Sequence, residues 1–194
     1  MQTTILPFKL ERTNDLITSQ AGLALLGEFM IGLDLVKWFD QGLPGPGSGA
    51  GYRPSAYILP LLLMLNGGGR TLEDLRRIHE DQALREVLVL REMPSSDATG
   101  DWLRRSGGNG ALDGLGGTNR QVLASGLKHD GRDGYTLDMD VLLIEAEKAA
   151  ARMTYKGFQG YGAMVGHLAE NGLVTGDEFR EGNEPPASRN LEFL

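Results

Sequence analysis

The sequence predicts an α+β fold, in which a helical N-terminal region is followed by antiparallel β-strands. Three observations lead to this prediction. Apolar residues recur at helical spacing from about residue 20 to residue 130. The run "YTLDMDV" (135–141) instead alternates apolar and polar residues, as a strand with one exposed face does. Asn171 and Gly172 then separate two further strand-like runs, which is a strong short-range signal for a β-hairpin.

Helical segments follow one another through the first 130 residues. Residues 20–40 carry apolar side chains at helical spacing, and a loop rich in Gly and Pro follows them. Residues 55–66 form a second apolar helix, for which Ser55 is a candidate N-cap. Thr71 and Asp74 have the spacing of a capping box. Another helix, capped by Ser95 or Ser96, is expected to run through Trp102 to Arg105. Further helical runs are expected at 72–81, 82–88 and 112–127.

Strands are predicted in the last third of the chain, over residues 135–141, 161–168 and 173–179. The residues that directly follow the first of these strands are rich in Glu and Lys, and they favour a helix. A short helix is also expected near the C-terminus, with Ser188 as its N-cap. These patterns divide the chain into a helical region, residues 1–130, and a strand-containing region, residues 131–194.

The composition excludes several classes of protein. The 194 residues include no cysteine, so neither a disulfide framework nor a thiolate metal site is available. No signal peptide is recognisable at the start of the sequence. The longest apolar run, "AYILPLLLML", has about half the length that a membrane span needs. We therefore expect a cytoplasmic protein that has no membrane partner.

The charges are distributed unevenly along the chain. The formal net charge is −7, and residues 135–194 hold 10 acidic and 5 basic side chains. The negative net charge does not favour binding to nucleic acid, and an acidic C-terminal third fits either a solvated surface or a cation-binding site. A DNA-binding surface is therefore expected to be local and to lie in the first two thirds of the chain.

Two aspartates interrupt the first predicted strand. Because side chains alternate along a strand, Asp138 and Asp140 lie on one face of it and repel each other unless a cation or water relieves them. One interpretation is a magnesium site, since Mg²⁺ prefers oxygen ligands on a rigid element. The other is an ordinary exposed face that carries acids. The spacing by itself favours the second interpretation, because Asp-x-Asp is short and common.

Several runs of the sequence, taken together and in order, resemble the DDE transposases of bacterial insertion sequences. These runs are "AGLALLGEF" (21–29), "LMLNGGGRTLEDLRRI" (63–78), "PSSDATGDWLRR" (94–105), "YTLDMD" (135–140), "IEAEK" (144–148), "TYKGFQGYGAMVGHLAENGLVTGDEFREGN" (154–183) and "NLEFL" (190–194). The resemblance covers nearly the whole chain. It implies a helical N-terminal region followed by an RNase H-like catalytic domain that begins with three antiparallel strands.

The resemblance also implies a role for Asp140. In the family, the second Asp of the "LDxD" motif is the first of three catalytic carboxylates, and Asp140 occupies that position. Three carboxylates hold two divalent ions, here magnesium, which activate the attacking hydroxyl and stabilise the leaving oxygen. Asp138 is a second candidate metal ligand. DNA at the transposon ends is the implied partner, and a homo-oligomer is a further expectation.

The sequence departs from the family pattern in two ways. The family usually has a small residue and then Thr after the catalytic Asp, whereas Val141 and Leu142 stand here. Larger apolar residues could displace the metal ligand or remove a supporting hydroxyl. The later catalytic Asp and Glu are expected beyond residue 194, on further strands and helices. Four acidic residues lie between the hairpin and the last helix, but they do not follow the elements that carry these catalytic residues in the family. These four residues are Asp177, Glu178, Glu181 and Glu184.

The function expected from these observations is that of a transposase. The chain is expected to be a truncated, N-terminal piece that is inactive alone, while the parent enzyme performs metal-dependent DNA cleavage and strand transfer. One alternative is a non-catalytic DNA-binding protein, derived from a transposase, that pairs with the full-length enzyme and inhibits it. Another is an unrelated α+β metal-binding domain, which the extent of the resemblance disfavours.

Three cationic residues are candidates for DNA contact. Arg104 and Arg105 lie together on a predicted helix and could contact phosphates, although an ordinary solvated helix face explains them equally well. Lys156 could reach a phosphate near the active site, but a solvated Lys beside a Gly bend is the simpler interpretation. The histidines lack the spacing of metal ligands and are interpreted as structural or exposed; they are His79, His129 and His167.

The predicted sheet is small, so it should leave apolar side chains uncovered. The residues expected to contribute to this apolar surface are Val141, Leu142, Val165, Leu168, Val174 and Phe179.

Overall fold

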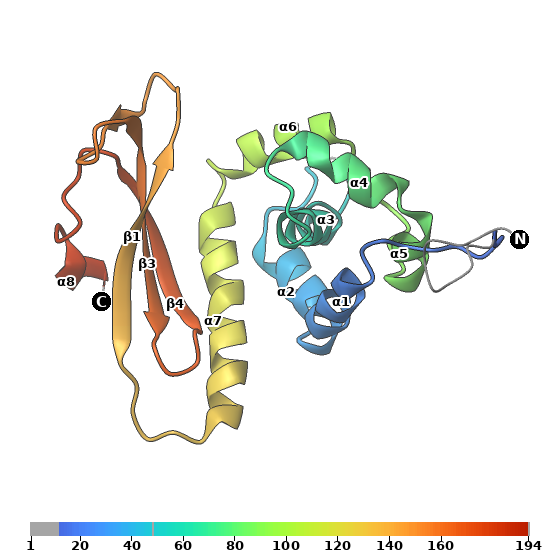
Figure 1. Ribbon diagram of the computed structural model, residues 1–194, viewed down its shortest axis with the longest axis horizontal. Helices are drawn as coiled ribbons and strands as arrows, with labels where there is room; N and C mark the ends of the chain where they lie inside the picture. Colours follow the sequence, from blue (N-terminus) through green and yellow to red (C-terminus); the bar gives the residue numbers. More distant parts are fainter. Residues whose placement is uncertain (1–11, 48, 194) are drawn as a thin grey trace, which may run out of the picture. The chain divides into compact units, whose positions relative to one another are not determined.

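The structure is a computed structural model that describes residues 12–47 and 49–193. It confirms the predicted α+β class, because several helices precede an antiparallel sheet of four strands (Figure 1). The chain forms two compact units. One contains the residues up to Asp40 together with Gly45–Ser106, and the other contains Gln41–Pro44 and the residues from Gly107 onward.

The helices of the first unit bury a single apolar core. Leu63, Ile78 and Leu84 are fully buried in it, and the rings of Tyr57 and Trp102 stack with their centroids 4.8 Å apart. The helices that precede residue 107 are α1 (Gly22–Gly32), α2 (Leu35–Gly42), α3 (Pro54–Asn66), η1 (Leu72–Asp74), α4 (Leu75–Glu80), α5 (Gln82–Val87) and α6 (Ser96–Ser106).

Two details of the predicted helices are wrong. The apolar pattern over residues 20–40 forms two helices, because Asp34 adopts a φ of 60° between α1 and α2. Ser55 is not an N-cap, since α3 begins at Pro54 and Arg53 occupies the cap position. The Ser55 N–H instead donates to Asp40 Oδ1 at 2.9 Å, so the side chain of Asp40 acts as the cap.

Two predicted caps are confirmed. Asp74 Oδ2 accepts the N–H groups of Arg70 at 2.9 Å and Thr71 at 3.0 Å, which closes the turn before α4. Ser95 Oγ accepts the N–H of Ala98 at 3.2 Å at the start of α6. Local hydrogen bonds of this kind satisfy N–H groups that a helix leaves without partners.

The sheet has four strands rather than the three that were predicted. They are β1 (Leu137–Glu145), β2 (Arg152–Met153), β3 (Gln159–Leu168) and β4 (Val174–Glu181), and β3 pairs with each of the other three. The helix expected directly after residue 141 does not form. Val141–Ile144 instead continue β1, because these residues pair with Tyr161–Met164 of β3 and alternate between half-buried and exposed.

The predicted hairpin joins β3 to β4. Gly172 adopts a φ of 72°, which is a conformation that glycine reaches without strain. The Gly172 N–H donates to Leu168 O at 2.7 Å, and the Leu173 N–H donates to Asn171 Oδ1 at 3.0 Å. Asn171 and Gly172 therefore form the turn through their own hydrogen bonds and backbone conformation.

Helix α7 (Ala111–Asp130) belongs to the second unit, although the sequence analysis grouped these residues with the helical region. It packs along Gly42 at Gly114, and it contacts the beginning of β4. Asn119 Nδ2 donates to Val174 O at 3.0 Å, and Leu173 packs over Gly126. Figure 1 shows α7 beside one face of the sheet and the short helix α8 (Asn190–Phe193) beside the other.

Helix α8 and the residues that lead into it cover part of one face of the sheet. Phe193 packs over Gly166 of β3, where a Cβ atom would lie 2.8 Å from its ring. Ser188 is not the N-cap of this helix, because Arg189 follows it with a φ of 54° and the helix begins at Asn190. Tertiary contacts with the sheet, rather than a local cap, determine where this segment lies.

A buried arginine of β4 forms hydrogen bonds with the same C-terminal segment. Arg180 is 3% exposed; its Nε donates to Glu178 Oε2 at 2.8 Å and its Nη1 donates to Ser188 O at 2.6 Å. Arg189 joins the network, with Nη1 at 2.9 Å from Glu178 Oε1 and Nε at 2.7 Å from Glu184 Oε1. A buried cation is stable only with such partners, so the C-terminal segment and the sheet depend on each other.

The other face of the sheet exposes part of its apolar surface, as expected. Leu142 is 64% exposed and Phe179 is 63% exposed, and Val174 is also exposed. Leu168, at 8%, is buried, so the expectation for this residue is wrong. The two remaining residues of the expected apolar surface, Val141 and Val165, are half-buried.

Replacing Arg180 with Ala should destabilise the second unit by about 3 kcal/mol, because Glu178 would keep a partly buried charge without its main partner. Hydrogen exchange of the β3 amides during urea unfolding would measure this loss. Arg152→Ala is the matched control, since its pair with Glu181 at 3.8 Å is half exposed and should contribute under about 1 kcal/mol. Equal losses in both variants would contradict a structural role for the Arg180 network.

The first unit should lose stability in acid through Asp74. The N–H of Arg70, and then that of Thr71, hold the pKa of Asp74 below its ordinary value of 3.8. Stability from this group is therefore complete above pH 3.8 and is lost as the pH falls through the lowered folded-state pKa. Asp74→Asn should reduce this acid sensitivity, measured by fluorescence of Trp38 and Trp102, which both lie in the first unit. Glu73→Gln is the control and should leave the sensitivity unchanged.

Candidate functional site

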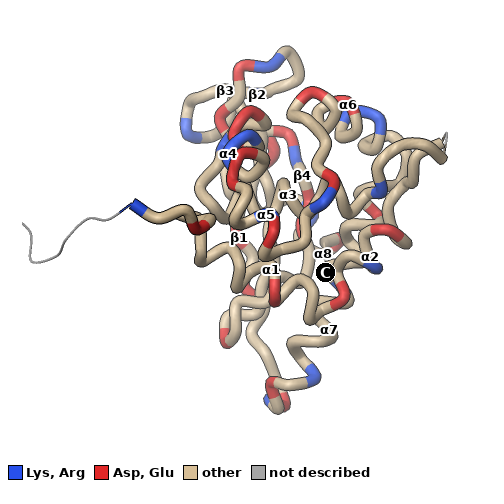
Figure 2. Tube along the Cα trace, turned by 90° about the vertical axis from the view of Figure 1, so that its right-hand side faces the viewer, with Lys and Arg blue, Asp and Glu red and all other residues tan. Residues whose placement is uncertain are grey.

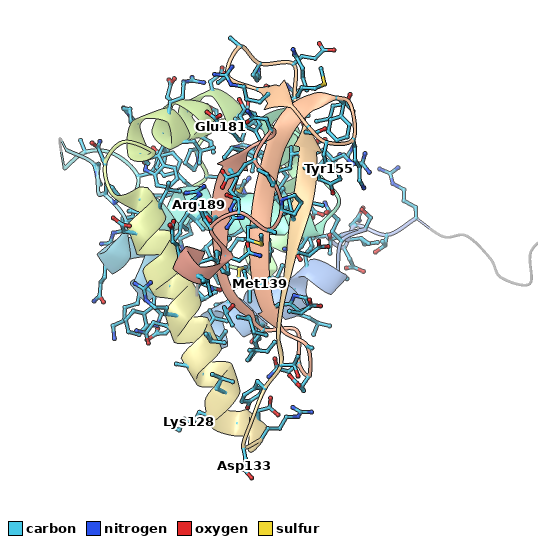
Figure 3. All side chains as sticks on the ribbon, turned by 90° about the vertical axis from the view of Figure 1, so that its left-hand side faces the viewer. Lys128, Asp133, Met139, Tyr155, Glu181 and Arg189 are labelled. Atoms are coloured by element: carbon cyan, nitrogen blue, oxygen red, sulfur yellow. The ribbon has the colours of Figure 1, made fainter. Side chains whose placement is uncertain are left out.

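The two aspartates of the predicted metal site lie on the exposed face of β1. Asp138 and Asp140 both point away from the half-buried residues Met139 and Val141, as strand alternation predicts. The same face carries the exposed Leu142. Figure 3 shows this sheet with its side chains and labels Met139, which lies between the two aspartates in sequence.

The pairing of β1 with β3 gives Asp138 a neighbour that the sequence analysis missed. His167 is directly opposite Asp138, and its Nε2 lies 3.9 Å from Asp138 Oδ2. The two residues are 29 positions apart, and no local spacing connects them. Only the register of the two strands reveals the contact, because residues that face each other in an antiparallel pair lie within reach of one another.

The carboxylate of Asp140 is engaged by its own strand. Asp140 Oδ1 accepts the N–H of Val141 at 2.8 Å. Asp140 is opposite Val165 of β3, and Val165 is opposite Asp177 of β4. Asp140 and Asp177 therefore share a row but stand two strand spacings apart, which is roughly 10 Å.

These carboxylates do not form a two-metal centre. Mg²⁺ holds its oxygen ligands at about 2 Å, so oxygens that share one ion lie within roughly 4 Å of each other. Asp138 is directed toward His167, Asp140 toward the Val141 N–H, and Asp177 stands two strands away. Among residues 12–47 and 49–193, no three acidic or histidine side chains converge on one point. The described donors therefore do not fit the pair of magnesium ions that the resemblance implies for the parent enzyme.

Lys156 lies at the other end of the sheet from Asp140. It belongs to the turn between β2 and β3, where Gly157 adopts a φ of 87° and Thr154 Oγ1 donates to Phe158 O at 2.9 Å. Val165, the partner of Asp140, is six residues along β3 from its start at Gln159, or roughly 20 Å. The structure thus does not bring Lys156 to the aspartates, and its Nζ lies near the ring of Tyr155, at 5.9 Å from the centroid.

Arg104 and Arg105 lie on the last turn of α6, in the first unit. Arg104 Nη2 donates to Asp101 Oδ1 at 2.5 Å, one helical turn away. Arg105 is exposed and has no acidic partner within the part of the chain that the structure describes. Trp102 of the same helix is buried against Tyr57 and is not available for contact with a ligand.

Basic and acidic residues both occur on the short helices α4 and α6, and Figure 2 colours the two kinds along the tube there. Arg76 lies 3.9 Å from Glu73, and Arg77 lies 3.5 Å from Asp74. Such exposed pairs contribute little to stability, but they lower the positive potential that a phosphate would meet.

No helix in residues 12–47 and 49–193 has both the length and the apolar composition required to cross a bilayer. Comparison with known protein families, with curated proteins and with solved structures finds no match to this chain.

Proposed function

We propose that this chain is derived from a DDE transposase and binds DNA without cutting it. The observation that carries the proposal is the position of Asp140, exposed on the first long strand of an antiparallel sheet that follows a helical unit. The order of the quoted sequence runs along the chain supports the same proposal. Transposase chemistry needs several carboxylates around two ions, and here Asp140 stands without such a group.

DNA binding is assigned to the first unit, because the strand-containing region is strongly acidic. Residues 135–194 hold 10 acidic and 5 basic side chains, which would repel a phosphate backbone. Arg105, exposed and without an ion pair among the described residues, is the residue of α6 best suited to a phosphate contact. The transposon ends are the proposed target, and self-association into a homo-oligomer is proposed as well.

A regulatory role is the second candidate function. The hydrogen bond from the Val141 N–H to Asp140 and the roughly 10 Å to Asp177 favour a protein that binds DNA without cleaving it. Such a protein could occupy transposon ends and exclude the active enzyme. Retardation of DNA that persists in a chelator would support this role over catalysis.

The purified chain should not nick supercoiled DNA with either Mg²⁺ or Mn²⁺, because a single carboxylate cannot organise two ions against their hydration. Gel analysis of plasmid topology measures the reaction. Metal-dependent nicking that disappears in Asp140→Asn would overturn this expectation and would show that the metal centre assembles.

Binding of a DNA duplex should weaken as salt rises, since Arg side chains that contact phosphates displace counterions. Replacing Arg104 and Arg105 together with Gln should reduce the slope of log K against log salt by about 1 to 2, at roughly 0.9 per phosphate. Fluorescence anisotropy measures both quantities. Lys148→Gln, a matched charge change in the acidic region, should leave the slope unchanged. A wild-type chain that binds no DNA at low salt would refute the proposed function.

A further inference from the structure

The first unit contains a pocket at the C-terminal end of α5. Its volume is about 580 Å³, and it is lined by Gln82, Arg85, Glu86, Val89, Leu90 and Arg91. Two of these side chains are cationic and one is anionic. The sequence analysis did not single out this segment, because Arg85 and Arg91 are six residues apart and carry no recognisable motif.

A strained turn brings the two arginines to the same pocket. The Leu90 N–H donates to Arg85 O at 2.9 Å and the Val89 N–H donates to Glu86 O at 3.2 Å, which closes the end of α5. Val89 occupies the left-handed position of this turn with a φ of 54°. Glycine is usual there, and a β-branched residue is strained in that conformation. Such strain is concentrated at ligand sites more often than elsewhere.

Neither arginine of the pocket is neutralised by a carboxylate in the described residues. In that part of the chain the Arg85 side chain makes one hydrogen bond, from Nη1 to His79 O at 3.1 Å, and its buried Nε finds no acceptor. Several other arginines of this unit do have acidic partners within 4.0 Å: Arg53, Arg76, Arg77 and Arg104. Arg85 and Arg91, like Arg105, therefore carry positive charge that no ion pair among the described residues compensates.

The one carboxylate that lines the pocket is already engaged. Glu86 Oε1 accepts a hydrogen bond from Gln82 Nε2 at 2.8 Å, one turn away on the same exposed helix face. Glu86 reduces the positive potential of the pocket without forming an ion pair with either arginine. Removing the negative charge of Glu86 should therefore raise the affinity of the pocket for an anion, whereas removing the charge of an arginine should lower it.

We propose that the Arg85–Arg91 pocket binds a phosphate group. Two guanidinium groups offer planar, paired N–H donors that match phosphate oxygens, and they remain charged at any physiological pH. Binding would supply an anionic partner for a cation that the described residues leave without one. This inference rests on the proposed function in one respect: the source of the phosphate is the backbone of bound DNA.

Two measurements on the full chain test the proposal. The first follows the Arg side-chain Nε–Hε resonances by NMR during titration with inorganic phosphate and, separately, with a DNA duplex. The second measures duplex affinity by fluorescence anisotropy. Arg91→Gln should weaken DNA binding about threefold to tenfold, as expected for loss of one charged contact, whereas Glu86→Gln should strengthen it. Arg53→Gln is the matched control, since Arg53 is exposed, pairs with Asp40 and lies outside the pocket.

The outcomes separate this proposal from the proposed function. Shifts of the Arg85 and Arg91 resonances with the duplex, together with weaker binding by Arg91→Gln but not by Arg53→Gln, support both. If the duplex does not bind but inorganic phosphate shifts these resonances, the DNA function fails and the pocket remains a site for free phosphate. If neither probe shifts them, or if Arg91→Gln binds DNA as the control does, the pocket proposal is overturned. Arg91 is exposed, so this variant tests the pocket even if Arg85→Gln fails to fold.

Discussion

The second unit depends on the pairing of β3 with three other strands. Every ladder of the sheet includes β3, so its register decides which side chains of β1 and β4 become neighbours. This register sets His167 beside Asp138 and places Val165 between Asp140 and Asp177. The chemistry available on this face therefore follows from the pairing. It offers an Asp–His contact and separated carboxylates rather than a compact metal centre.

The two faces of the sheet are covered to different extents. One face is partly covered by Phe193 over Gly166 and by the buried Arg180, which holds the carbonyl of Ser188. Helix α7 meets the sheet at the beginning of β4, through Asn119 and Leu173. The other face keeps both acids and large apolar side chains exposed, including Leu142 and Phe179.

Charge compensation distinguishes the arginines of the first unit. The arginines of α4, and Arg104 of α6, have an acidic residue one helical turn away, which limits the potential that they present to a phosphate. Arg85 and Arg91 form no ion pair within 4.0 Å among the described residues, and both line the pocket beside the strained turn at Val89. A count of basic residues along the chain does not reveal this difference, because it depends on which side chains are already paired.

The sequence by itself determined the features whose interactions are local. The caps at Asp74 and Ser95, the Asn171–Gly172 turn and the change from helical to alternating pattern each depend on residues within a few positions of one another. The tertiary structure decided the rest. Residues 142–145 have helical propensity but extend β1, because pairing with β3 satisfies their backbone and buries alternate side chains. The Asp138–His167 contact and the burial of Arg180 likewise join residues whose proximity depends on strand register or on the path of the C-terminal segment. No periodicity in the sequence encodes such pairings, since they arise only when distant segments share one sheet.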